Sequence, residues 1–305
     1  MKSANAKIYG KINLSLNING VNNDYHMLDS VVTTVSVYDI VKVKERKDDK
    51  ILITFSGKYQ TVFKDQSKTN AYKTAVKFME KYGKKGLDIE IIRNIKDGGG
   101  LGSSSADIVG VLLALKKLYG VSESVKPIAD SMGSDPGYLL NGGYARITSR
   151  GEVVSPFECK NKYYFVILYA DSGVSTKECF ELFDKSNTIG NLSNNDELIN
   201  DLISGDIDKI SKNINNALKD SAVILNAQIK ENINEIQSLS PKIVSMTGSG
   251  STVFAMYENY EFASWAHDKL AKKHGEKVQL LTTVNPKEFS LIDFLCGYTT
   301  CENTK

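Results

Sequence analysis

The segment from Asp97 to Asp107 places four glycines and three serines within eleven residues, directly before an apolar stretch at 108–119. A strand candidate at 86–93 precedes it. Strand, glycine loop and helix in this order present free backbone N–H groups and the positive end of a helix dipole to an anion, usually a phosphate. Glycine lets the backbone approach closely and adopt positive φ, and serine hydroxyls add donors. We therefore expect a phosphate site at this loop rather than a plain turn with a helix cap.

The loop does not match the commonest nucleotide motifs. No lysine follows the glycines at the position that a Walker loop requires. The dinucleotide fingerprint needs glycine or alanine where Ser103 or Ser105 stands. The His-Arg-Asp and Asp-Phe-Gly signatures of protein kinases are absent from the sequence. A nucleotide bound here must be held by a different scheme.

Composition sets the outer limits. A chain of 305 residues can bury a sizeable core and most naturally forms two lobes. A net charge of +2 gives no reason to expect nucleic acid or a membrane surface as a partner. No stretch approaches the roughly 18 apolar residues of a membrane span, and the N-terminus lacks a secretion signal. The four cysteines form no Cys-x-x-Cys pair and there are three histidines, so we expect a cytoplasmic protein without a metal cluster of its own.

Strand and helix patterns alternate along the chain, which predicts an α+β fold with two lobes, at 1–155 and 156–305. The expected strands lie at 7–18, 30–43, 51–56, 86–93, 143–148, 163–169, 242–246, 253–256 and 278–282. The expected helices lie at 70–82, 108–119, 123–131, within 177–240, and at 261–273.

Three segments, in order, resemble the motifs of one kinase family. The loop at 100–106 resembles the phosphate-binding motif of the GHMP kinases, which include galactokinase, homoserine kinase and mevalonate kinase. The segment at 246–252 resembles the C-terminal glycine motif of that family, and 11–14 resembles the N-terminal motif. The resemblance implies an N-terminal lobe like the second domain of ribosomal protein S5 and a ferredoxin-like C-terminal lobe. It also implies that ATP with Mg²⁺ phosphorylates a small alcohol.

The resemblance also assigns roles. Asp135 would take the proton of the attacking hydroxyl, and Lys11 would lie beside it and offset phosphoryl charge. Without the resemblance, Asp135 is more typical of a turn or cap and Lys11 of a solvated strand edge. Ser104 or Ser105 would lie near Mg²⁺. The residues expected to bind the ATP phosphates are Asp97, Gly98, Gly99, Gly100, Leu101, Gly102, Ser103, Ser104 and Ser105.

Aromatic residues favour one branch of the family, whose acceptor is a cytidine diphosphate alcohol of isoprenoid biosynthesis. Tyr25, His26 and Phe180 would form the cytosine pocket, since a flat base stacks between aromatic rings. Taken singly, His26 is more typical of a surface residue and Phe180 of a helix core. The second glycine loop would lie under the acceptor diphosphate or support the first loop. The further residues expected to contact the acceptor are Asn13, Thr176, Gly248, Ser249 and Gly250.

Some positions depart from the family pattern. Lys96 stands where the family has proline before its glycines, and Ser103 and Ser104 replace glycines of this branch. These changes leave two alternatives open: a diverged kinase of the same family for another small alcohol, and a non-catalytic nucleotide-binding protein. Lys11 and Asp135 argue for catalysis. We expect a monomer or a weak homodimer.

Overall fold

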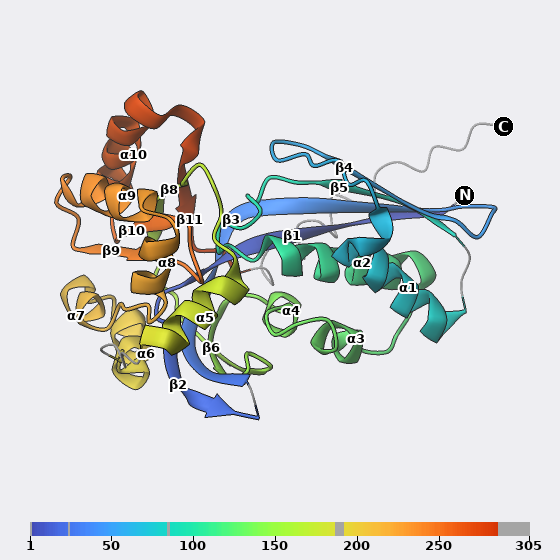
Figure 1. The fold of residues 1–305 in the computed structure, drawn as a ribbon, viewed down its shortest axis with the longest axis horizontal. Coiled ribbons are helices and arrows are strands. Elements are labelled where there is room, and N and C mark those ends of the chain that lie inside the picture. Colours follow the sequence, from blue (N-terminus) through green and yellow to red (C-terminus); the bar gives the residue numbers. More distant parts are fainter. Residues whose placement is uncertain (1, 24, 84–85, 187–191, 286–305) are drawn as a thin grey trace.

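The computed structural model describes residues 2–23, 25–83, 86–186 and 192–285, which form two sheets with helices packed against them (Figure 1). Within these ranges, no helix combines the length and apolar character needed to span a bilayer. The first sheet has seven strands. Its members are β1 (Ser3–Asn13), β2 (Asn17–Asn22), β3 (Tyr25–Glu45), β4 (Ile51–Ser56), β5 (Leu87–Ile92), β6 (Tyr144–Ser149) and β7 (Val153–Phe157).

Strand β3 organises this sheet, because its 21 residues pair with β1, β2, β5 and β6. Lys11 and Asn13, at the end of β1, lie opposite Thr34 and Val32 of β3. The predicted strand at 7–18 is interrupted at 14–16. The N–H groups of Leu14 and Ser15 both donate to one carbonyl, that of Val31, so the ladder loses its register there. The chain then turns toward the C-terminal half.

Helix α2 (Ser103–Tyr119) is buried along most of its length, as its nearly continuous apolar sequence predicts. It starts at Ser103, five residues before the apolar run, because Gly102 adopts a φ of +86° and turns the chain into the helix. Helix α1 (Asn70–Tyr82) packs beside it. The hydroxyl of Thr69 caps α1 by accepting from the Tyr72 N–H. Two short helices, α3 (Lys126–Asp130) and α4 (Pro136–Leu139), lead back to the sheet.

The second sheet has four antiparallel strands in the order β11-β8-β10-β9. Along the chain, β8 precedes a helical region, β9 and β10 follow, and α10 leads to β11, which is the ferredoxin-like arrangement that the resemblance implied. The strands are β8 (Tyr164–Leu168), β9 (Ile243–Met246), β10 (Val253–Tyr257) and β11 (Val278–Thr282). The helices are α5 (Thr176–Ser186), α6 (Asn195–Ser204), α7 (Ile207–Lys212), α8 (Lys219–Leu225), α9 (Gln228–Gln237) and α10 (Tyr260–His274).

The two halves share a core. One cluster of buried side chains contains Ile12 and Leu14 from the first sheet together with Phe165 and Phe254 from the second. Strand β7 pairs with β6 and runs across residues 155 and 156, where the boundary between the two lobes was expected. The position of that boundary therefore stays a prediction. Because apolar packing joins the sheets, side chains from both halves can hold fixed positions at the junction.

The approach of α2 to β3 yields a prediction. A Cβ on Gly110 would lie 2.4 Å from Cγ2 of Val41, so Gly110→Ala should destabilise the fold by about 1–3 kcal/mol through overpacking. This loss should exceed the helix-propensity gain of up to about 1 kcal/mol. Urea unfolding monitored by circular dichroism measures the change. Val41→Ala should make room, so the double variant should lose less stability than the sum of the single variants. Simple additivity would contradict the close contact.

Candidate active site

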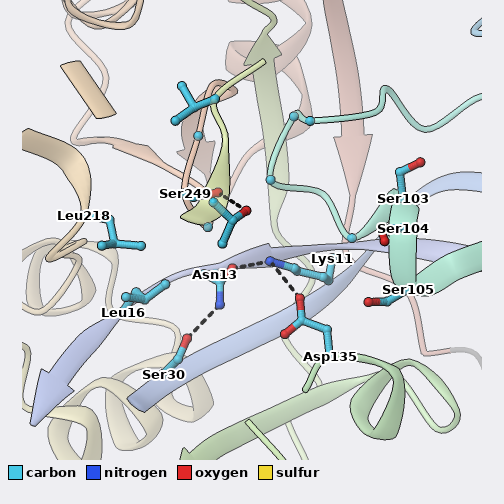
Figure 2. A pocket seen from close by; sticks show the side chains of 18 of the residues that line it. Lys11, Asn13, Leu16, Ser30, Ser103, Ser104, Ser105, Asp135, Leu218 and Ser249 are labelled. Carbon is cyan, nitrogen blue, oxygen red and sulfur yellow. Dashed lines mark hydrogen bonds and ion pairs between the residues drawn. The ribbon is translucent and has the colours of Figure 1, made fainter. Parts of the chain in front are cut away.

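A cavity of about 310 Å³ lies where the two halves meet (Figure 2). Its walls come from the end of β1, the glycine loop with the start of α2, the turn before α4, α5, and the loop between β9 and β10. The residues that line it and matter for the argument are Lys11, Asn13, Leu16, Ser30, Asp97, Gly98, Gly99, Gly100, Gly102, Ser103, Ser104, Ser105, Asp135, Thr176, Phe180, Leu218, Gly248, Ser249 and Gly250. Leu101, the remaining residue expected at the phosphates, is fully buried and is not among those lining residues.

The glycine loop has the backbone that the sequence predicts. Gly98, Gly100 and Gly102 have φ values of +64°, +75° and +86°, a region in which a side chain is strained. At Gly100 space is also lacking, because a Cβ would lie 2.1 Å from the Thr247 carbonyl oxygen. The loop therefore depends on glycine for its path and for its contact with the second loop.

The start of α2 is suited to an anion. The first N–H groups of a helix have no intrahelical acceptor, and Gly102 at the cap has no side chain to accept from them. The buried Ser103 Oγ finds no hydrogen-bond partner among the described residues. The N–H groups of this first turn and the positive end of the helix dipole lie at the wall of the cavity. A phosphate would satisfy them.

Lys11 is buried at the cavity floor, with 6% of its surface exposed. Its Nζ donates to Oδ1 of Asn13 and lies 3.9 Å from Oδ2 of Asp135, as Figure 2 shows. Burial lowers the pKa of the Lys11 ammonium below its ordinary value, and the Asp135 carboxylate partly opposes that shift. Asn13 is held in turn by donating to Ser30 Oγ at 2.8 Å. The predicted pair of Lys11 and Asp135 is thus brought together.

The Asp135 carboxylate remains available for chemistry. Asp135 precedes α4, and its backbone carbonyl accepts from the N–H groups of Tyr138 and Leu139. Its side chain makes no capping hydrogen bond to the helix and is 43% exposed. The buried Tyr138 ring fixes the turn, because its hydroxyl contacts Thr34 Oγ1 at 2.9 Å and donates to the Gly143 carbonyl at 2.7 Å. The carboxylate therefore points into the cavity from a rigid turn.

Thr247 connects the end of β1 to both glycine loops. Its Oγ1 accepts from the Asn13 N–H at 3.0 Å and donates to the Gly100 carbonyl at 3.2 Å. The residue is fully buried. Sequence reasoning placed Thr247 in the second motif but gave it no role, because neither partner is near it in the chain.

The second glycine loop packs directly on the first. Gly248 has a φ of +59°, and a Cβ there would lie 3.2 Å from the Gly100 carbonyl oxygen and 3.3 Å from Lys11 Nζ. Ser249 Oγ contacts Thr176 Oγ1 of α5 at 2.9 Å. The second loop was expected either to lie under the acceptor diphosphate or to support the first loop. Its direct contact with the first loop is consistent with the supporting role.

The three expected aromatic residues are only partly assembled. The His26 ring lies against Phe180, with a centroid separation of 4.5 Å, and its Nε2 is 2.7 Å from Oδ1 of Asp184. Tyr25 is 54% exposed and has the Arg150 guanidinium 4.7 Å from its ring centroid. Among the described residues, Phe180 lines the cavity, whereas Tyr25 and His26 do not. The cytosine pocket stays a prediction.

A buried charge cluster behind the loop was missed from the sequence. Arg93, at the end of β5, forms an ion pair with Asp107 in the first turns of α2, and its Nη1 lies 3.8 Å from Oδ2 of Asp97. Burial raises the pKa of Asp107 to about 7 and that of nearby Asp39 to about 6. The sequence did contain a signal for this cluster, because Asp97 and Asp107 stand at the two ends of the glycine segment. The cluster ties those two ends together.

Both halves of the chain are similar to one family of kinases. The family model of the GHMP kinase N-terminal domain matches residues 70–136, and that of the GHMP kinase C-terminal domain matches 198–277. Over 286 residues the chain is 32% identical to a 4-diphosphocytidyl-2-C-methyl-D-erythritol kinase of Clostridium perfringens strain 13, covering 92% of this chain and 98% of the relative. The namesake of Clostridium beijerinckii is 30% identical over 275 residues, or 88% and 96% of the two chains.

Solved structures share the fold. A crystal structure of 4-(cytidine 5'-diphospho)-2C-methyl-D-erythritol kinase superposes with a TM-score of 0.74 at 24% identity, covering 91% of this chain and 98% of the other. A homoserine kinase from Cytophaga hutchinsonii superposes with a TM-score of 0.68 at 18% identity, over 93% and 95% of the two chains. Both lobes and their junction are therefore common to these proteins.

The Thr247 hydroxyl yields a prediction. Thr247→Val keeps the shape but leaves the Asn13 N–H and the Gly100 carbonyl without this partner, so it should destabilise the protein by about 1–3 kcal/mol for each group that stays unpaired. Thr247→Ser retains the hydroxyl and should keep most of the stability. Chemical unfolding of the three proteins measures this difference. Loss of stability in the serine variant without loss in the valine variant would show that the methyl contact matters and the hydroxyl does not.

Proposed function

This chain belongs to the GHMP kinase family, and we propose that it transfers the γ-phosphoryl group of ATP to the 2-hydroxyl of 4-diphosphocytidyl-2-C-methyl-D-erythritol. The observation that carries a kinase role is the Lys11–Asp135 pair at the floor of a cavity with a glycine loop as its wall. The acceptor rests on relatives of that name, which are 30–32% identical over nearly their whole length.

Asp135 acts as the general base. In the proposed reaction the acceptor hydroxyl gives its proton to the Asp135 carboxylate as its oxygen forms a bond to the γ-phosphorus. The bond from that phosphorus to the oxygen bridging to the β-phosphate breaks, and ADP leaves with the electron pair. The side chain suits this role because it is partly exposed to the cavity and makes no cap hydrogen bond.

Lys11 supplies positive charge beside the base. Its ammonium stabilises the negative charge on the transferring phosphoryl group, an effect that grows as water is excluded from the site. Asn13 orients the ammonium, because its Oδ1 accepts from Nζ while its Nδ2 donates to Ser30. The buried lysine is therefore pre-aligned toward the cavity and Asp135.

The glycine loop and the first turn of α2 hold the phosphates of ATP. The residues fit the group, since the uncapped helix start and the positive-φ glycines offer main-chain donors to an anion. The hydroxyls of Ser104 and Ser105 would hold Mg²⁺ together with phosphate oxygens. When bound, Mg²⁺ neutralises charge on those oxygens. No cluster of three or more acidic, His or Cys side chains among the described residues could hold it alone.

A second candidate is a GHMP-family kinase for a smaller alcohol. One observation favours it: the His26 ring packs against the Phe180 ring, and Asp184 holds the His26 ring there. Cytosine binding would then require His26 to move or to share the space. Cytidine diphosphate should raise the melting temperature of a cytidyl-specific enzyme and leave that of the alternative unchanged.

The proposal predicts turnover of the named acceptor. In a coupled ADP-release assay, the protein should consume ATP only when 4-diphosphocytidyl-2-C-methyl-D-erythritol is present. Asp135→Asn should lower kcat by at least about 100-fold because it removes the base, while ATP still raises the melting temperature. Folded wild-type protein without turnover would exclude this acceptor. A near-normal rate in Asp135→Asn would exclude the assigned base.

The buried lysine predicts an alkaline limit. Burial lowers the pKa of Lys11 below its ordinary value of about 10.5. As pH rises, Lys11 therefore loses its positive charge before an exposed lysine would, and kcat/KM should fall at that lower pH. Lys11→Arg keeps its proton, so its slower rate should lack this decline. A pH profile of both proteins provides the measurement. The same alkaline decline in both would assign it to another group.

A further inference from the structure

The acceptor side of the cavity is built from segments far apart in the chain. Leu16 follows β1, Leu218 precedes α8, and Gly248 begins the second glycine loop, and all three line the cavity. Figure 2 shows Leu16 and Leu218 facing the same space from the side away from the glycine loop at α2. Contacts outside the cavity must therefore hold these three segments in fixed positions relative to one another.

The Asn216 side chain lies outside the cavity and forms hydrogen bonds with the segments that carry Leu218 and Gly248. Its Nδ2 donates to the carbonyls of Met246 and Gly248, each at 2.8 Å, and its Oδ1 accepts from the Leu218 N–H at 2.9 Å. Its backbone pairs with Leu16 in an isolated parallel bridge. The amide thus uses both of its hydrogens and its oxygen on the main chain of neighbouring segments.

Asn216 does not touch the cavity. It is 4% exposed and is not among the described residues that line it, so it cannot act by contacting a ligand. The carbonyl that it holds belongs to Gly248, where a Cβ would lie 3.3 Å from Lys11 Nζ. A small shift of Gly248 would therefore alter the space next to the reactive ammonium.

We propose that Asn216 is a positioning residue that fixes the second glycine loop against Leu16 and Leu218 and thereby sets the orientation of the acceptor. This role rests on the proposed kinase function. The ATP phosphates face the other wall, at α2, so acceptor binding should depend on Asn216 more than ATP binding does.

Asn216→Asp tests the role. Aspartate replaces the donating amide by an oxygen that faces two carbonyl oxygens, so the loop should lose its anchor. We expect the KM of the acceptor to rise at least tenfold, with the KM of ATP within twofold of wild type. Asn161 offers a matched control, because its Nδ2 also donates to two backbone carbonyls, those of Leu202 and Ile203, each at 2.8 Å. Asn161→Asp should lower the melting temperature and leave both KM values within twofold.

Amide exchange gives a readout that needs no substrate. The Gly250 N–H donates to the Thr247 carbonyl at 3.0 Å, so it reports on the shape of the second loop. Its exchange should accelerate at least tenfold in Asn216→Asp and stay unchanged in Asn161→Asp. If Asn216→Asp does not fold, Asn216→Ala removes the donors without adding charge and carries the same expectations.

The outcomes separate the two claims. Lack of turnover by the wild-type protein counts against the proposed acceptor and leaves the exchange measurement to decide the role of Asn216. Unchanged Gly250 exchange overturns the positioning role in every case. Faster exchange with an unchanged acceptor KM, or an equal rise in both KM values, also overturns it, because either result describes general loosening of the structure.

Discussion

The site depends on one hydroxyl group that joins three distant segments. Thr247 accepts from Asn13, two residues after Lys11, and donates to Gly100, two residues before the cap of α2. The strand that carries Lys11, the first glycine loop and the second glycine loop therefore share one fixed point. Placing reactive groups on elements locked in this way keeps them in productive geometry without further adjustment when substrate binds.

Electrostatics behind the loop support the same arrangement. A carboxylate in the first turns of a helix competes with an anion for the positive end of the dipole. Asp107 stands there, and its pairing with Arg93 offsets its charge. The raised pKa of Asp107, caused mainly by burial, further favours its neutral form. Both effects leave the start of α2 attractive to an anion, although neither Arg93 nor Asp107 is among the described residues that line the cavity.

Much of the fold and part of the site could be predicted from the sequence, because the signals for them lie in local patterns. Strand alternation, the glycine loop and the Lys11–Asp135 assignment rest on local patterns and ordered motifs, and the structure brings that pair together. The features that escaped include the break after Asn13, strand β7, the ion pair of Arg93 with Asp107, and the hydrogen bonds of Thr247 and Asn216. Each arises from pairing between distant residues, and a polar residue carries no local sign of its distant partner. The aromatic trio was assembled only in part because its members belong to β3 and α5, whose relative placement no motif encodes.

The two walls of the cavity differ in how freely they can change. The phosphate wall is built from main-chain donors that follow one another in sequence, so its chemistry requires glycine and short side chains at set positions. The wall that the proposed function gives to the acceptor combines Leu16, Leu218 and Gly248, and Asn216 holds it by donating to the Gly248 carbonyl and accepting from the Leu218 N–H. Substitution of a lining side chain there can alter acceptor choice without disturbing the backbone that Asn216 holds. Under the proposed function, the glycine loop together with the Lys11–Asp135 pair defines the kinase reaction, and the second wall sets the choice of acceptor.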